Sequence, residues 1–198
     1  MADQEQSRET EVLEDPMQSK KRKKRSKTLI EWSAVLVVAI LLAVGVRAFV
    51  FESFFIPSGS MLPTLQIGDR ILVDKLSYDF HSVHRGDIIV FRKPPADVGS
   101  PTIHDLVKRV IGLPGDRISA VDGHVYINGK RLYEPYLPAS ALTYHLTPQI
   151  VPKGDVFVMG DNRENSYDSR YFGPISEKLI VGRVVLIFYP FSQFRLYW

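Results

Sequence analysis

The amino-acid sequence predicts an all-β fold in which a mostly antiparallel β-sheet body carries a small appended β lobe and follows one N-terminal transmembrane helix. Three observations predict this arrangement. One continuous apolar segment lies near the N-terminus, short β-branched runs separated by Gly, Pro and Asp follow Pro57, and turn-forming Asx-Gly pairs separate some of these runs. The 198 residues, of which 45% are hydrophobic and 24% charged, suffice for one compact body with its own core.

Residues 1–27 form a charged tail that is predicted to be disordered. Acidic side chains dominate its first half, and seven of the 25 basic residues of the chain lie between residues 20 and 27. A segment with so few apolar groups does not bury enough surface to fold. These seven positive charges exceed the net charge of the chain, +3, so the rest of the chain is slightly acidic. A broad nucleic-acid-binding face is therefore not predicted.

Residues 28–51 are predicted to form a membrane anchor. Between residues 29 and 51 the only polar side chains are those of Glu31, Ser33 and Arg47. A helix of about 20 such residues spans the hydrocarbon core of a bilayer. The basic run on its N-terminal side predicts a cytoplasmic N-terminus and an extracytoplasmic body. A cleaved secretory signal and a buried core helix are the alternatives, and the length and continuity of the apolar run disfavour both.

Residues 52–198 are predicted to form the β body. Its candidate strands are the short apolar runs at residues 70–74, 87–91, 106–111, 117–120, 124–127, 156–159 and 180–188. Asp122-Gly123 and Asn128-Gly129 predict a tight turn on either side of residues 124–127, and therefore a small hairpin or meander.

The same signals divide the body into a core and a small lobe. Residues 52–116 and 152–190 are expected to form the core, and residues 117–151 the lobe. Four prolines and few apolar residues occur between residues 134 and 152, which predicts an exposed loop that leads back to the core.

A candidate nucleophile lies in the first segment after the apolar run. Residues 56–65, with the sequence IPSGSMLPTL, place Ser58 and Ser60 between two prolines and around one glycine, which favours a fixed, extended loop. A serine hydroxyl is a weak nucleophile until a base accepts its proton. A polar turn without a chemical role is the alternative interpretation of this segment.

Two residue types are candidates for that base. His104 with Asp105 is one, but neighbouring residues of a strand point to opposite faces, which disfavours a triad. Lys108 is the other, because it lies in a strongly apolar candidate strand, where burial lowers the pKa of an ammonium group from about 10.4. A solvent-facing lysine paired with an acid is the alternative. The chain contains no cysteine, so a thiolate nucleophile and a disulfide are excluded.

A third polar segment follows the candidate strand at residues 156–159. Residues 160–170, with the sequence GDNRENSYDSR, are rich in hydrogen-bonding side chains. So many polar groups after a core strand favour a scaffold around a site, and a surface turn with an ion pair is the alternative. The spacing of the three segments does not by itself bring them together.

These three segments, in this order behind an apolar N-terminal run, resemble the signature motifs of the bacterial type I signal peptidases (leader peptidases), which are Ser-Lys serine peptidases. The similarity extends over residues 47–190 and includes residues 85–91, RGDIIVF. It implies that Ser60 is the nucleophile, that Lys108 is the general base, and that Ser58 supports the oxyanion hole. The further residues that it implies are Ser166 to orient Lys108, Asp168 paired with Arg170, Asp161 in the same network, and Ile56, Met61 and Val107 in the substrate pockets.

The resemblance also implies a membrane-bound serine endopeptidase that removes N-terminal signal peptides from exported preproteins after small residues, at Ala-X-Ala sites. The implied partners are preprotein signal peptides, the lipid bilayer and the protein-export machinery, and no nucleic acid. No metal ion or organic cofactor is implied, because the histidines are scattered and form no cluster with ligand spacing. A different Ser-Lys peptidase and a non-enzymatic, membrane-anchored β module remain the alternatives.

Overall fold

The computed structural model describes residues 16–98 and 102–197, and for residues 16–30, 47 and 48 it describes the backbone alone. The chain divides into two units, Met1–Val46 and Arg47–Trp198. Residues 1–15 of the expected tail, and the side chains of residues 28–30, 47 and 48 of the expected anchor, therefore lie outside the description. Among the described residues, the structure has no helix whose length and apolar character would allow it to cross a membrane.

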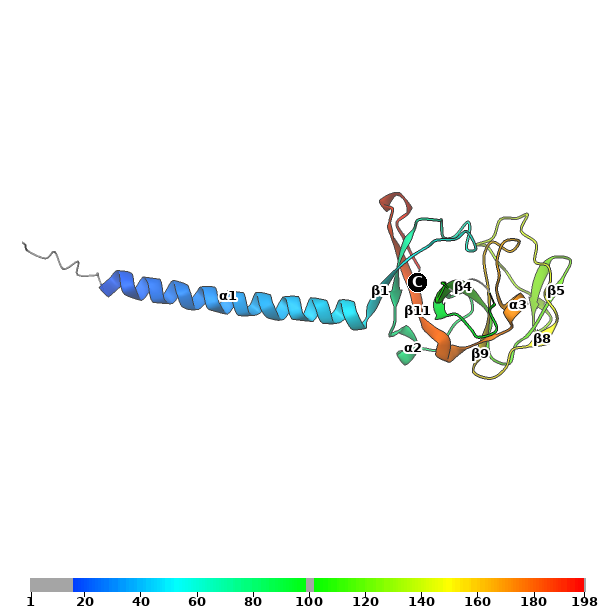
Figure 1. Ribbon diagram of the computed structural model, residues 1–198, viewed down its shortest axis with the longest axis horizontal. Coiled ribbons are helices and arrows are strands. Elements are labelled where there is room, and N and C mark those ends of the chain that lie inside the picture. The colour runs from blue at the N-terminus through cyan, green and yellow to red at the C-terminus, as the bar shows by residue number, and fades with distance from the viewer. Residues whose placement is uncertain (1–15, 99–101, 198) are drawn as a thin grey trace, which may run out of the picture. The chain divides into compact units, whose positions relative to one another are not determined.

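The helix α1, Pro16–Phe49, corrects both boundaries of the predicted N-terminal region (Figure 1). It begins before the basic run, so residues 16–27 of the expected tail have a helical backbone. Lysine, arginine, glutamine and methionine are good helix formers, and they lead directly into the apolar helical segment. The helix ends at Phe49, and residue 51, which was expected in the anchor, begins the strand β1, Phe51–Phe55.

The unit Arg47–Trp198 is mostly β, as predicted, and contains two antiparallel sheets (Figure 1). The eight-stranded sheet has the order β1, β2 (Arg70–Asp74), β11 (Ile180–Tyr189), β3 (Ile88–Arg92), β4 (Asp105–Gly112), β9 (Asp155–Met159) and β10 (Ile175–Ser176), with β12 (Arg195–Leu196) paired to β11. The four-stranded sheet has the order β7 (Lys130–Arg131), β6 (His124–Ile127), β5 (Arg117–Val121) and β8 (Gln149–Ile150). Four short helical segments connect strands: α2 (Ser77–Phe80), α3 (Ser169–Phe172), η1 (Glu177–Leu179) and η2 (Phe191–Gln193).

The predicted strands are confirmed to within one residue at each end. The two Asx-Gly turns are also confirmed, because Asp122 and Gly123 have φ values of 49° and 76°, and Asn128 and Gly129 have values of 53° and 80°. Positive φ at both central residues is the type I′ geometry that matches the twist of a hairpin. These turns join β5 to β6 and β6 to β7.

The cores of the two sheets are joined through β4 and β9. The cores form because the central strands are apolar on both faces, as in β3, where residues 88–91 are all buried. Around the four-stranded sheet, Ile118 and Val125 of the lobe pack with Ile111 of β4 and with Phe157 and Met159 of β9. The lobe is thus seated on the strand that carries the candidate base.

The expectation of an exposed loop over residues 134–152 is wrong in part. Thr143 and Leu146 are only 3% and 8% exposed, and Val151 is buried as well. Leu146 and Val151 belong to the lobe core, and residues 149–150 add the strand β8 to the sheet. The stretch packs against the lobe despite its prolines, because its few apolar residues reach the lobe core.

Candidate active site

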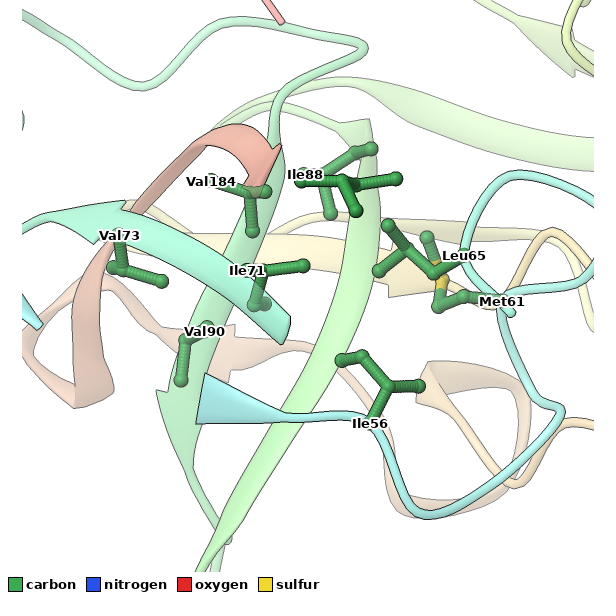
Figure 2. Close-up of a cluster of buried hydrophobic side chains, with 9 residues drawn as sticks. Ile56, Met61, Leu65, Ile71, Val73, Ile88, Val90 and Val184 are labelled. Atoms are coloured by element: carbon green, nitrogen blue, oxygen red, sulfur yellow. The ribbon is translucent and has the colours of Figure 1, made fainter. Parts of the chain in front are cut away.

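The serine segment is held by its own apolar side chains. Ile56, Met61 and Leu65 are at most 4% exposed. Figure 2 shows them in one cluster with side chains of three strands, namely Ile71, Val73, Ile88, Val90 and Val184. The backbone closes the segment further, since Leu65 N–H donates to the Met61 carbonyl at 2.9 Å. Ser60 precedes Met61, so the packing of Met61 fixes the position of the Ser60 hydroxyl.

Lys108 lies beside that hydroxyl. It is the fourth residue of β4, pairs with Ile89 of β3, and is 3% exposed. Its Nζ lies 2.6 Å from Ser60 Oγ and donates to it in the protonated state. Burial is the largest influence on this group and, against the opposing negative charge of Asp168, lowers the pKa of Lys108 to about 8. The strand therefore presents a basic amine that exchanges its proton near neutral pH.

Asp168 and Arg170 form a buried ion pair in the 160–170 segment. Arg170 Nε donates to Asp168 Oδ1 at 2.8 Å, and Arg170 Nη2 donates to Oδ2 at 2.9 Å. The same carboxylate accepts from Gly160 N–H at 3.0 Å and lies at the N-terminus of α3. The pair thus holds both ends of the segment together. A side chain at residue 160 would overlap the Ser60 carbonyl oxygen, which requires glycine there.

Ser166 does not make the hydrogen bond to Lys108 that the family resemblance implies. Ser166 is 6% exposed and its Oγ lies against Gly160. Among the described residues Ser166 Oγ has no hydrogen-bond partner, so it does not bond to Lys108. Ser58 is exposed, two residues before Ser60.

Asp161 lies in a second buried ion pair, on the other face of β4. Arg109 donates to its carboxylate through Nε at 2.9 Å and through Nη2 at 2.7 Å. Thr64, from the serine segment, donates its hydroxyl to the same carboxylate. The side chains of Arg109 and Asp161 are 8% and 0% exposed. This pair joins β4, the 160–170 segment and the serine segment at one point.

The three residues expected in substrate pockets belong to one apolar cluster. Ile56 and Met61 are buried in it, and Val107, which is half-buried, packs against it. Val107 is next to Lys108 on β4 and Met61 is next to Ser60. Ile56 and Met61 therefore expose very little apolar surface, and Val107 exposes more.

The histidine alternative and a metal centre find no support in the geometry. His104 is exposed at the start of β4, whereas Lys108 contacts Ser60 directly. Among residues 16–98 and 102–197, no group of three or more His, Asp or Glu side chains is placed to hold a metal ion. The geometry places the Lys108 amine within hydrogen-bonding distance of the Ser60 hydroxyl.

A comparison with protein families identifies the family of the chain. The family of signal peptidases, peptidase S26, matches the chain over residues 29–189. The chain belongs to this family. It is accordingly a serine peptidase, and its relatives are similar over almost their whole lengths.

Two curated signal peptidases illustrate the similarity. The chain is 42% identical over 188 residues to the probable signal peptidase I-2 of Synechocystis sp., with 94% of this chain and 85% of the relative covered. It is 40% identical over 186 residues to the signal peptidase I T of Bacillus subtilis, with 89% and 93% covered. The crystal structure of a signal peptidase I from Enterococcus faecalis is 32% identical, with 52% of this chain and 97% of that chain covered and a TM-score of 0.41.

Sequence reasoning missed several residues of this signal peptidase site. Asn162 donates to the Ser60 carbonyl through its N–H and to the Gly59 carbonyl through Nδ2, both at 3.0 Å. Arg109 is adjacent to Lys108, and Asn162 is adjacent to Asp161. The signal that could have found Arg109 is its charge next to the apolar run Val110-Ile111 of a central strand, where a buried arginine requires a carboxylate partner.

Proposed function

We propose that this peptidase removes N-terminal signal peptides from exported preproteins and cleaves after small residues at Ala-X-Ala sites. In this proposal Ser60 is the nucleophile and Lys108 is the general base. The observation that carries the proposal is the 2.6 Å contact between Lys108 Nζ and Ser60 Oγ in a buried environment. With the pKa of Lys108 lowered to about 8, roughly a tenth of the molecules hold a neutral amine at pH 7.

In the acylation step, the neutral Lys108 amine accepts the proton of the Ser60 hydroxyl. Ser60 Oγ forms a bond to the scissile carbonyl carbon, and the carbonyl π electrons move to oxygen to give a tetrahedral oxyanion. Collapse of this species breaks the C–N bond, and the Lys108 ammonium returns its proton to the departing amine. The products are the mature protein and a signal peptide esterified to Ser60.

Deacylation repeats the same proton path with water. Lys108, neutral again, accepts a proton from a water molecule that attacks the ester carbonyl, and then protonates Ser60 Oγ as the ester bond breaks. The hydroxyl of Ser60 and the free carboxylate of the signal peptide result. Lys108 serves as the base in both steps, because its ammonium gives its proton to the departing amine before deacylation begins.

The oxyanion needs hydrogen-bond donors fixed in advance. We assign this role to the Ser60 N–H and to the Ser58 hydroxyl, which would rotate toward the substrate from its exposed position. Each such donor contributes about 3–4 kcal/mol to transition-state stabilisation in serine peptidases. The Asp168–Arg170 and Arg109–Asp161 pairs support the site by fixing Gly160 and Asp161 behind Ser60, and Ser166 packs against Gly160.

Substrate choice would follow from the shallow apolar surface formed by Ile56, Met61 and Val107. Since one added methylene changes binding by about 1–3 kcal/mol, a shallow surface accepts alanine and rejects larger side chains. Such a surface recognises the residues one and three positions before the cut, and the rest of the signal sequence does not have to be recognised.

We further propose that the apolar part of α1, residues 28–49, holds the peptidase in the bilayer, with a cytoplasmic N-terminus, and that the export machinery delivers substrates there. Support comes from the apolar run, in which the consecutive residues 35–38 are 54–61% exposed. Four consecutive residues face all sides of a helix, so this surface is apolar all round. Full-length protein is expected to remain in the membrane fraction after alkaline carbonate extraction, and its release would contradict the anchor.

Cleavage of a purified preprotein tests the dyad. Full-length protein in detergent is expected to cut after the final alanine of an Ala-X-Ala site, and Ser60→Ala and Lys108→Ala are expected to abolish the cut. Lys130→Ala, which removes an exposed lysine of β7, is the matched control and retains activity. Full activity of Lys108→Ala would exclude the lysine mechanism and favour a histidine. An inactive unaltered chain would contradict the proposed cleavage at Ala-X-Ala sites.

A further inference from the structure

Two residues of the lobe reach the buried charges behind the dyad. The Tyr136 ring lies over the Arg109 guanidinium, with 3.9 Å between Arg109 Cζ and the ring centroid. The Tyr136 hydroxyl donates to Glu134 Oε1 at 2.8 Å. Tyr136 and Glu134 are half-buried and lie between β7 and β8, in the stretch that the sequence predicts to be an exposed loop. We call these two residues the lobe pair.

Glu134 binds a second buried arginine. Its Oε2 accepts from Arg163 Nη1 at 3.2 Å, and its Oε1 accepts from Arg163 Nη2 at a closer contact. Arg163 also donates to Thr143 Oγ1 at 2.7 Å and is 3% exposed. Burial acts to lower the pKa of Arg163, but the Glu134 carboxylate outweighs it and raises the pKa. Arg163 therefore remains charged and requires Glu134 as its counter-charge.

Both arginines donate hydrogen bonds to the segment that supports the nucleophile. Arg163 Nε donates to the Gly160 carbonyl at 3.2 Å, and Arg109 binds the Asp161 carboxylate in a bidentate contact. The next residue, Asn162, donates to the Ser60 carbonyl at 3.0 Å. Contacts therefore run without interruption from the lobe pair through the two guanidinium groups and residues 160–162 to the backbone of Ser60.

We propose that Glu134 and Tyr136 are positioning residues for the reaction, through which the lobe sets the placement of Ser60 against Lys108. This inference rests on the proposed dyad. Neither residue contacts the dyad, so each acts through Arg109, Arg163 and the 160–162 backbone. A planar ring and a carboxylate fix both the plane and the direction of the two guanidinium groups, which a solvent shell would not do. Misplacement of a nucleophile by 1 Å costs about 100-fold in rate.

Substitutions at Tyr136 separate the ring from the hydroxyl. Tyr136→Leu removes both and is expected to lower kcat by about 10- to 100-fold with little change in KM, since remote misplacement affects the chemical step. Tyr136→Trp keeps an aromatic face over Arg109 and is expected to recover kcat to within about 5-fold of the unaltered enzyme. Tyr133→Leu is the matched control, because Tyr133 is 84% exposed in the same stretch and its loss should leave kcat unchanged.

The isosteric Glu134→Gln tests the charge. It keeps the shape of the side chain but removes the counter-charge of Arg163, and kcat is expected to fall about 10-fold. All variants are assayed full-length in detergent, below a melting temperature determined for each by circular dichroism. If Tyr136→Leu does not fold, Glu134→Gln and Tyr136→Trp provide the test.

A change in melting temperature with an unchanged kcat in Tyr136→Leu and Glu134→Gln would overturn the proposal, because it would show that the lobe pair contributes to stability alone. A rise in KM with an unchanged kcat would overturn it too, since the pair would then act in binding. The Ser60→Ala and Lys108→Ala variants test the proposed dyad separately. If Ser60→Ala and Lys108→Ala retain activity, the proposed mechanism is wrong. If they are inactive while the lobe-pair variants match the unaltered kcat, only the positioning role is wrong.

Discussion

The two faces of β4 hold neighbouring basic residues in opposite electrostatic settings. Lys108 and Arg109 are 3% and 7% exposed, so burial is similar for both. On one face, the Lys108 amine contacts the neutral hydroxyl of Ser60 and forms no ion pair with any described residue. On the other face, Arg109 has a bidentate carboxylate partner in Asp161 and an aromatic ring, Tyr136, over its guanidinium.

This difference allows one strand to carry both the proposed base and a structural ion pair. A carboxylate beside Lys108 would stabilise the ammonium form and oppose its use as a base, so the amine requires desolvation without a close counter-charge. The opposite holds for Arg109, since a buried guanidinium without a carboxylate is costly. Alternation of side chains along a strand allows both settings within one residue of each other.

The largest expected effect comes from a substitution of Lys108 that keeps its positive charge. Lys108→Arg is expected to lower kcat/KM for a preprotein by about 1,000-fold or more, because a guanidinium does not release its proton at accessible pH. Lys130→Arg on the exposed strand β7 is the control and should cleave normally. Retention of more than a tenth of the activity by a folded Lys108→Arg variant would show that the charge of this residue, rather than its proton exchange, matters.

The next effect is on stability and concerns the other face. Arg109→Leu leaves the Asp161 carboxylate buried without its partner, and is expected to lower the free energy of unfolding by about 3–5 kcal/mol. Urea unfolding followed by circular dichroism measures this loss. The double variant with Asp161→Leu removes both charges and should recover most of the stability. If the single variant is as stable as the unaltered chain, the contrast between the two faces is wrong.

Local patterns predicted much of this architecture. The strands and the two type I′ turns follow from β-branched runs and Asx-Gly pairs, which act over a few residues. The end of α1 was misplaced because Phe49, Phe51 and Phe54 continue the apolar character of the helix into β1, and aromatic residues suit either element. Composition alone does not separate a helix end from a strand start there.

The candidate site was predictable only where chemistry limits the choice. Sequence context made Ser60 and Lys108 candidates, since a serine needs a base and Lys108 lies in an apolar strand, and the family resemblance implied their roles. The Arg109–Tyr136 and Arg163–Glu134 contacts could not be inferred, because they join segments far apart in the sequence and lie in a stretch without periodic apolar residues. Long-range pairs of this kind depend on the packing of the lobe, which no local pattern encodes.

The smallest expected effect is the pH dependence of the unaltered enzyme. Since the pKa of Lys108 lies at about 8, kcat/KM should rise with pH to a plateau above that value. Below it, activity should fall about tenfold per pH unit, because the ammonium form cannot accept the Ser60 proton.

The negative charge of Asp168 opposes the effect of burial on Lys108 and raises its pKa. Asp168→Asn should therefore move the midpoint of the profile to lower pH, provided that the variant is folded by circular dichroism. Initial rates with one preprotein between pH 6 and pH 10 give both midpoints. A midpoint near 10.4, the ordinary value for lysine, would show that Lys108 is not desolvated. A midpoint near 6.5 that does not respond to Asp168→Asn would indicate a histidine base. It would contradict the proposed difference between the two faces of β4.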